Sequence, residues 1–144
     1  MKKTIRRIFN ITISCVFLLV LMVPTVNAAV LASDFFAYTD VVPISAGGGN
    51  ITVESDVNAK RIMQEVGVKS FAIYEQQPNG SYSNVKTYTS DNTTGFIKKN
   101  SIEAFVSVTY KGISGRNYYV SYALYAKDSS GSETLYGSTS VFKA

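Results

Sequence analysis

Residues 104–110 read Ala-Phe-Val-Ser-Val-Thr-Tyr, and this stretch decides the fold class. Alanine, valine and tyrosine at the even positions alternate with phenylalanine, serine and threonine at the odd positions. Successive side chains of a β-strand point to opposite faces of its sheet, so a period of two predicts a strand with one buried face. Residues 51–57 repeat the pattern, with aliphatic residues at three of the four odd positions. The sequence therefore predicts antiparallel strands that each cover one side of a core.

Turn-forming residues divide the chain after residue 34 into short segments. Stretches rich in glycine, serine, asparagine and aspartate, typical of turns and loops, lie at 45–49, 78–80, 90–95, 111–115 and 128–132. Extended segments are predicted between them at 35–42, 51–57, 68–74, 82–88, 96–97, 104–110, 118–126 and 135–142. Pro43 is expected to end the first of these. The sequence thus predicts seven or eight locally connected strands at the spacing of a sandwich.

One segment has a helical rather than an extended pattern. Asn58 could cap a helix, Ile62, Met63 and Val66 could share one face of it, and Gly67 could end it. We expect one or two helical turns there, crossing an end of the sandwich.

The stretch Gly-Arg-Asn-Tyr-Tyr-Val at 115–120 resembles the start of the penultimate strand of an immunoglobulin-like or fibronectin type III-like sandwich. In that fold a tyrosine near the start of this strand bonds through its hydroxyl to backbone a few residues upstream, as a tyrosine corner. The resemblance covers residues 101–142, places Tyr118 at the corner and makes Ile113 an apolar plug. It implies an all-β, single antiparallel immunoglobulin-like β-sandwich and no particular function, because such sandwiches serve many roles.

A second resemblance covers nearly the whole predicted domain. It rests on Met-x-x-Val-Gly-Val-x-Ser-x-x-Ile-Tyr at 63–74, Tyr-x-Gly-Ile-Ser-Gly-x-x-Tyr-Tyr at 110–119 and Tyr-Ala-Lys-Asp-Ser-Ser-Gly-Ser-Glu-Thr at 125–134. These motifs resemble a family of small exported proteins of unknown function from Gram-positive bacteria. The resemblance implies export and a compact β-fold. No activity or binding residues are established for that family, so it transfers none.

Residues 1–28 have the three parts of a secretory signal peptide. The basic head comprises Lys2, Lys3, Arg6 and Arg7. An apolar run follows over residues 8–23, Pro24 then breaks the helix, and small residues surround a cleavage position after Ala28. A second acceptable cut lies after Ala32. We therefore expect an exported protein.

Three other interpretations of this leader fit less well. Cys15 lies in the middle of the apolar run, so lipidation there would leave half of the run on the exported protein. Arg6 and Arg7 suggest a twin-arginine signal, but the strongly apolar core favours the general export route. The run of about 16 residues is shorter than the roughly 20 that a membrane-spanning helix needs, so we expect no anchor after cleavage.

Composition excludes several classes of function for the exported part. Four of the 14 basic residues leave with the leader, and the ten that remain balance ten acidic residues. A net charge of zero provides no basic excess for nucleic acid. The chain has no histidine, and its one cysteine lies in the leader. Disulfides, thiolate nucleophiles, imidazole bases and the usual zinc ligands are therefore excluded.

Two groups of polar residues could bind a metal or perform catalysis. Residues 128–133 (Asp-Ser-Ser-Gly-Ser-Glu) could offer oxygens to Ca²⁺, although hairpin turns use the same residues, and Asp91-Asn92 is a weaker case. Paired carboxylates could hydrolyse a glycoside, but no pair among the ten acids stands out. Sequons at Asn50 and Asn92 fit a strand entry and a loop. We therefore assign no catalytic, cofactor or metal residues and expect no cofactor.

Tyrosine is the most promising source of a binding surface. If Tyr118, Val120, Tyr122 and Leu124 face the core, then Tyr119, Ser121, Ala123 and Tyr125 face outward. The tyrosines that could form an aromatic platform for a sugar or peptide are Tyr74, Tyr82, Tyr88, Tyr119 and Tyr125. Exposed tyrosines on neighbouring strands also stabilise sheets without any ligand.

Taken together, these patterns predict a signal peptide at 1–28 and one β-sandwich domain at 29–144. We expect a secreted, non-catalytic monomer that binds an extracellular protein or glycan at the cell surface or in the medium. Two alternatives stay open: a structural component that associates with itself through sheet edges, and a small carboxylate-based hydrolase.

Overall fold

The computed structural model describes residues 33–144, so the expected signal peptide lies outside the described residues. These residues form seven strands and no helix. The strands are β1 (Phe36–Gly47), β2 (Asn50–Gln76), β3 (Tyr82–Thr89), β4 (Ile97–Lys111), β5 (Asn117–Asp128), β6 (Gly131–Ser138) and β7 (Phe142–Lys143). The predicted all-β class and the number of strands are confirmed. Within residues 33–144, no helix could cross a membrane.

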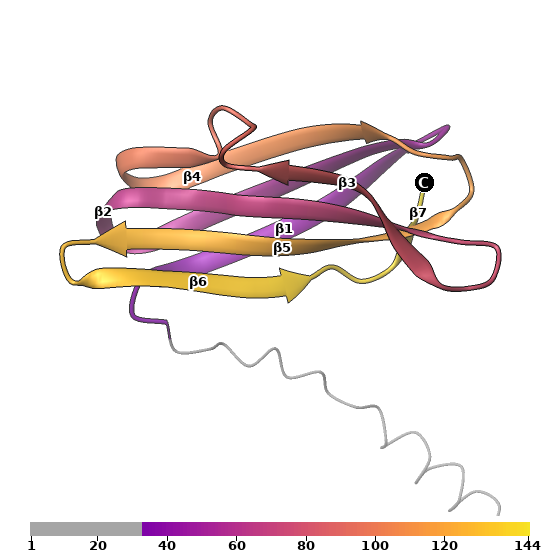
Figure 1. Cartoon of the computed structure of the whole chain (residues 1–144). Coiled ribbons are helices and arrows are strands. Elements are labelled where there is room, and N and C mark those ends of the chain that lie inside the picture. The colour runs from indigo at the N-terminus through magenta and orange to yellow at the C-terminus, as the bar shows by residue number, and fades with distance from the viewer. Residues whose placement is uncertain (1–32) are drawn as a thin grey trace, which may run out of the picture. The chain divides into compact units, whose positions relative to one another are not determined.

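Strand pairing divides the sheet into two layers that share β2 (Figure 1). The first half of β2 pairs with β1 on one side and with β4 on the other. Its second half pairs with β3 and with β5, and β5 pairs in turn with β6 and β7. All these pairs are antiparallel. β1, β2 and β4 thus take the places of strands A, B and E of an immunoglobulin-like sandwich, and β2, β5 and β6 those of C, F and G.

The segment predicted to be helical is instead the bend at which β2 passes from one layer to the other. Asn58 pairs with Glu103 and Met63 with Ser101, so five steps along β2 face only two along β4. The extra residues bulge out of the ladder and turn the strand. Met63 is buried while Ile62 is 69% exposed, which is the alternation of extended chain and not one helical face. The helix prediction is therefore wrong.

Gly67 makes close packing possible just after this bend. The Val68 amide donates to the Phe96 carbonyl at 2.9 Å, which brings the chain before β4 directly against β2. A Cβ atom on Gly67 would collide with that same carbonyl oxygen, and φ at Gly67 is +150°. Gly67 is thus required by a close backbone approach, not as the end of a helix.

Pro43 does not end the first strand. β1 continues through it to Gly47, and Pro43 lies opposite Val53 in register. β1 is an edge strand, so a residue without an N–H group is tolerated where no neighbour needs that donor.

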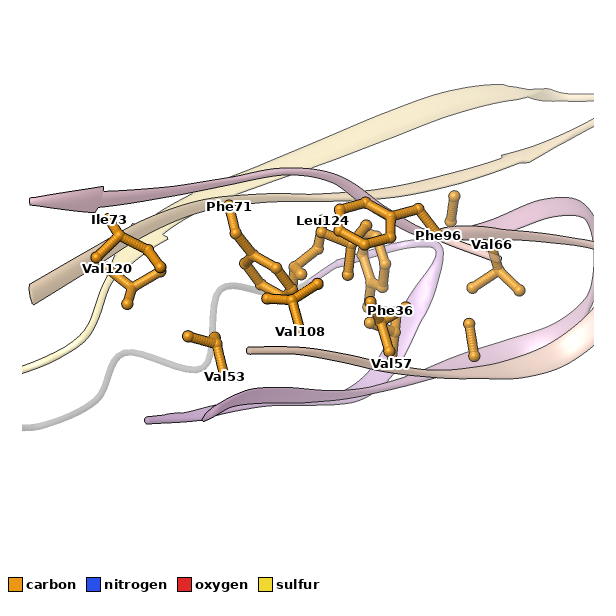
Figure 2. Close-up of a cluster of buried hydrophobic side chains, with 14 of the residues drawn as sticks. Phe36, Val53, Val57, Val66, Phe71, Ile73, Phe96, Val108, Val120 and Leu124 are labelled. Carbon is orange, nitrogen blue, oxygen red and sulfur yellow. The ribbon is translucent and has the colours of Figure 1, made fainter. Parts of the chain in front are cut away.

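The core lies between the two layers (Figure 2). Val53, Val57 and Val108 come from one layer and meet Phe71, Ile73, Val120 and Leu124 from the other, and all seven side chains are buried. Phe71 and Phe96 make a T-shaped contact within this core, at 5.6 Å between ring centroids. These positions confirm the predicted alternation in β2, β4 and β5.

The outward positions of β1, β4 and the first half of β2 form what we call the acidic face. Its residues are Tyr38, Asp40, Val42, Ile44, Asn50, Thr52, Glu54, Asp56, Asn58, Glu103, Phe105, Ser107, Thr109 and Lys111. Lys111, at one end, is the single cation in this set, and it donates to Asn50 at 3.0 Å. Side chains at the intervening positions of β2 and β4, such as Val53 and Val106, are buried, which fixes the outward direction of the others.

Candidate functional site

Tyr118 fixes which side chains of β5 face outward. Its side chain is fully buried, and its hydroxyl accepts a hydrogen bond from the Ile113 amide at 2.7 Å. The predicted tyrosine corner is confirmed. Ile113 is not a plug, however, because its side chain is 51% exposed. With Tyr118 pointing inward, Tyr119 must point outward.

A buried carboxylate completes the corner. The Tyr118 hydroxyl donates to Oε2 of Glu75 at 2.5 Å, and Arg116 donates to Oε1 of the same carboxylate at 2.6 Å. Glu75 is only 5% exposed, so both of its oxygens are held by fixed donors. Burial, together with the hydrogen bond to Glu75, raises the pKa of Tyr118 to about 12. This carboxylate serves to lock β2, β5 and the loop before β5 together.

The outward positions of β3, β5, β6 and the second half of β2 form a surface that we call the tyrosine face. It is uncharged except at the end that carries Tyr125, where Lys127 lies opposite Glu65 and Lys69 contacts the Tyr125 ring. Its tyrosines are Tyr74, Tyr82, Tyr119, Tyr125 and Tyr136. The positions between them carry Ser70, Ala72, Gln76, Asn84, Thr87, Thr89, Asn117, Ser121, Ala123, Thr134 and Ser138. Side chains that combine a large ring with a polar tip are enriched at binding surfaces.

Three of these tyrosines are in direct contact. Tyr74 and Tyr119 lie opposite each other on β2 and β5, and their rings stack at 4.7 Å with an angle of 2° between planes. Tyr82 packs edge-on against Tyr119 at 5.1 Å. The Asn117 amide donates to Gln76 at 2.9 Å beside the cluster. The rings hold one another in place, so little side-chain entropy remains to be lost on binding.

Four of the five predicted platform residues lie on this face, and the fifth, Tyr88, does not. Tyr88 lies on the opposite side of β3, where its hydroxyl donates to the Thr109 carbonyl at 2.5 Å and ties β3 to β4. Tyr136 was missed, although it is the most exposed tyrosine of the face at 81%. The sequence signal is the apolar Leu135: if it faces the core, alternation turns Tyr136 outward. In the structure Leu135 lies opposite the inward-facing Leu124.

A shallow, open depression borders the tyrosine face. Glu65, Lys69, Ser90, Asp91, Ile97, Lys99 and Tyr125 line it. The Lys69 ammonium lies 3.9 Å from the centroid of the Tyr125 ring, a cation–π contact. Two of its residues, Glu65 and Asp91, are carboxylates, but an open depression does not exclude water from them.

The loop proposed for calcium uses its oxygens to form a turn. Asp128 accepts from the Ser130 amide at 2.7 Å and from its hydroxyl at 2.6 Å, and it also pairs with Arg61. These contacts, led by the Ser130 hydroxyl, lower the pKa of Asp128 to about 2. Glu133 instead accepts from the Ser33 hydroxyl at 2.8 Å. The two carboxylates therefore serve different partners.

No set of three or more acidic, histidine or cysteine side chains in residues 33–144 is arranged to hold a metal ion. In the second polar loop, the Asn92 side chain accepts from the Thr89 amide at 2.8 Å and stabilises a turn. Asn50, the other sequon residue, opens β2 as expected.

Comparison of the chain with protein-family models gives no match, and comparison with curated proteins gives none.

Proposed function

We propose that this is an exported, non-catalytic binding module whose tyrosine face contacts an extracellular protein or glycan. The single observation that supports this is the gathering of five tyrosines on one side of the sandwich, where the charged residues Glu65, Lys69 and Lys127 are confined to the end that carries Tyr125. Stacking on rings and hydrogen bonding to hydroxyl and amide groups suit an uncharged, hydroxyl-rich ligand.

The extent of the face favours an extended ligand. Its outward residues run across four neighbouring strands, and the depression beside it is open. Such a surface suits a polymer chain or another protein better than a small molecule, which binds in an enclosed pocket.

The test measures binding of the exported protein to an array of neutral and charged oligosaccharides and to purified surface proteins of the producing cell. Tyr136→Ser and Tyr119→Ser are each expected to weaken binding by about tenfold or more, as aromatic anchors do. Ile62→Ser is the matched control, because Ile62 is 69% exposed and lies on neither face. Retained binding in both tyrosine variants would contradict the proposal.

A structural role is the second candidate, favoured by β6. β6 pairs with β5 alone and without a register shift, and its sequence GSETLYGS contains no lysine or proline. Those are the features that usually block pairing between sheet edges. Sedimentation at increasing concentration separates the candidates: the binding module stays monomeric, whereas edge pairing gives assemblies that Thr134→Pro abolishes.

A further inference from the structure

The acidic face carries several exposed apolar side chains. Phe105 is 60% exposed and Tyr38 is 55% exposed, and Val42 and Ile44 on β1 are 42% and 43% exposed. Single exposed apolar residues are ordinary, but several on one face are typical of an interaction surface.

Carboxylates without cationic partners lie among these apolar side chains. Asp40 and Asp56 are directly opposite each other across β1 and β2, and Glu54 is the next outward residue of β2. Glu103 lies on β4 opposite Asn58. Within residues 33–144 the two ion pairs are Arg61–Asp128 and Arg116–Glu75, so none of the four carboxylates is in an ion pair there.

This arrangement opposes folding. Like charges directly opposite each other destabilise a pair of strands. The field of the pair extends to Tyr38, whose pKa is raised chiefly by the Asp40 carboxylate. Residues 33–144 contain as many basic as acidic side chains, so the excess of acid is local to this face and does not follow from overall composition. Local violations of folding rules are expected where function requires them.

We propose that the acidic face binds a cationic amphipathic segment of a protein partner. Three of the four outward residues of β1 are apolar or aromatic, and the neighbouring outward residues of β2 include the adjacent carboxylates Glu54 and Asp56. A partner lying along the strands would place apolar side chains over Val42 and Ile44 and lysine or arginine side chains over Glu54 and Asp56. Binding would then relieve the repulsion between Asp40 and Asp56 as well as bury apolar surface.

This surface is separate from the tyrosine face, since the two belong to different layers of the sandwich (Figure 1). The inference therefore does not rest on the proposed function, and either can fail alone.

The test uses three labelled synthetic peptides and the exported protein. One peptide consists of leucine and lysine, with the leucines on one face of a helix. The second has glutamate in place of lysine, and the third has the composition of the first in scrambled order. Fluorescence anisotropy gives the Kd of each peptide.

The leucine–lysine peptide is expected to bind, with Kd rising about tenfold or more as salt increases from about 0.05 to 0.5 M. The scrambled peptide is expected to bind more weakly and the glutamate peptide not to bind.

Four variants locate the binding. Asp56→Asn and Phe105→Ser are each expected to raise Kd by about fivefold or more, the equivalent of losing one surface contact. Asp91→Asn and Ile62→Ser remove an exposed carboxylate and an exposed apolar side chain elsewhere, and they are expected to leave Kd unchanged. Denaturant midpoints establish that all four variants are folded.

Three results would overturn the proposal: no binding of the leucine–lysine peptide at about 0.1 mM, equal binding of the glutamate peptide, or equal losses in the two control variants. The tyrosine-face variants Tyr136→Ser and Tyr119→Ser report on the proposed function separately, through the glycans and surface proteins.

Discussion

The tyrosine face and the acidic face are built in the same way, but their side chains have opposite effects on the stability of the fold. Both are the outward sides of antiparallel strands that share β2 and lie over one core. On the tyrosine face, cross-strand neighbours attract, as in the stacked pair Tyr74–Tyr119. On the acidic face, Asp40 and Asp56 repel each other. Stability thus accounts for much of the tyrosine face and for none of the carboxylate arrangement, and this difference is the reason for proposing a partner at the acidic face.

The largest effect is expected at Gly67, where β2 has just joined the layer of the tyrosine face. Gly67→Ala forces a Cβ atom against the Phe96 carbonyl and strains a backbone at φ +150°. We expect the free energy of unfolding to fall by about 2–4 kcal/mol, because overpacking and backbone strain both destabilise the folded state. Denaturant unfolding measures the change. Since β2 contributes to both faces, ligand binding at both should decline together, and a variant that lost only one would show that the layers are independent.

The next effect compares the inside and the outside of β5. Tyr118→Phe leaves the Ile113 amide and one oxygen of Glu75 without their partner, at a loss of about 1–3 kcal/mol. Tyr119→Phe removes the same atom from an outward ring that keeps its stacking on Tyr74, and it should change stability by less than about 0.5 kcal/mol. Denaturant midpoints of the two variants provide the measurement. Equal losses would mean that the corner does not set the phase of the tyrosine face.

Alkaline pH tests the same corner without changing its shape. The pKa of Tyr118 is raised from 10.0 to about 12, so the fold favours the neutral hydroxyl. Its contribution to stability is complete below pH 10 and is lost as pH rises through about 12. The difference in denaturant midpoint between the wild type and Tyr118→Phe should therefore shrink over that range. The other tyrosines ionise in both proteins, so their effect on the midpoint cancels in this difference. A constant difference would contradict the role of the hydroxyl.

The smallest effect has the opposite sign. Asp56→Asn removes the repulsion from Asp40 and keeps an oxygen that can accept from Asn58, so it should stabilise the protein by about 0.2–1 kcal/mol. The gain should fade as salt screens the pair in the wild type. Denaturant unfolding of the wild type and the variant at low and high ionic strength measures the gain in stability and its dependence on salt. A loss of stability would mean that the carboxylate has a structural partner and that the acidic face needs no ligand to explain it.

Local patterns were sufficient for some of these features and insufficient for others. Alternation in residues 104–110 predicted a half-buried strand, and the glycine-to-tyrosine spacing at 115–118 predicted the corner, because both depend on neighbours in the chain. The residues of the bend in β2 have a helical pattern because Met63 and Val66 are spaced to share a helical face. In the structure they are buried by β4 and β5, which are distant in sequence.

The two faces show the same limit. Four of the platform tyrosines could be assigned from strand phase alone, but Tyr88 was misplaced because a shift in register between β2 and β3 follows Ile73. No local signal places Asp40 opposite Asp56, since that pairing follows from the register of β1 on β2. The acidic face could therefore not be predicted from the sequence, because its carboxylates come together only through the pairing of β1 with β2.

The single strand that passes through both layers also determines how the chain can fold. Four of the other six strands pair with β2, so few of the pairings can form before it is in place. The turn from β1 into β2 is short, but Glu75 must find Tyr118 at a separation of 43 residues. Closing such distant contacts is slow, and β-rich domains of this kind fold in milliseconds to seconds rather than microseconds. Until β5 arrives, the second half of β2 stays open on the side that β5 will cover, and this is the interval in which the new chain is most exposed to mispairing.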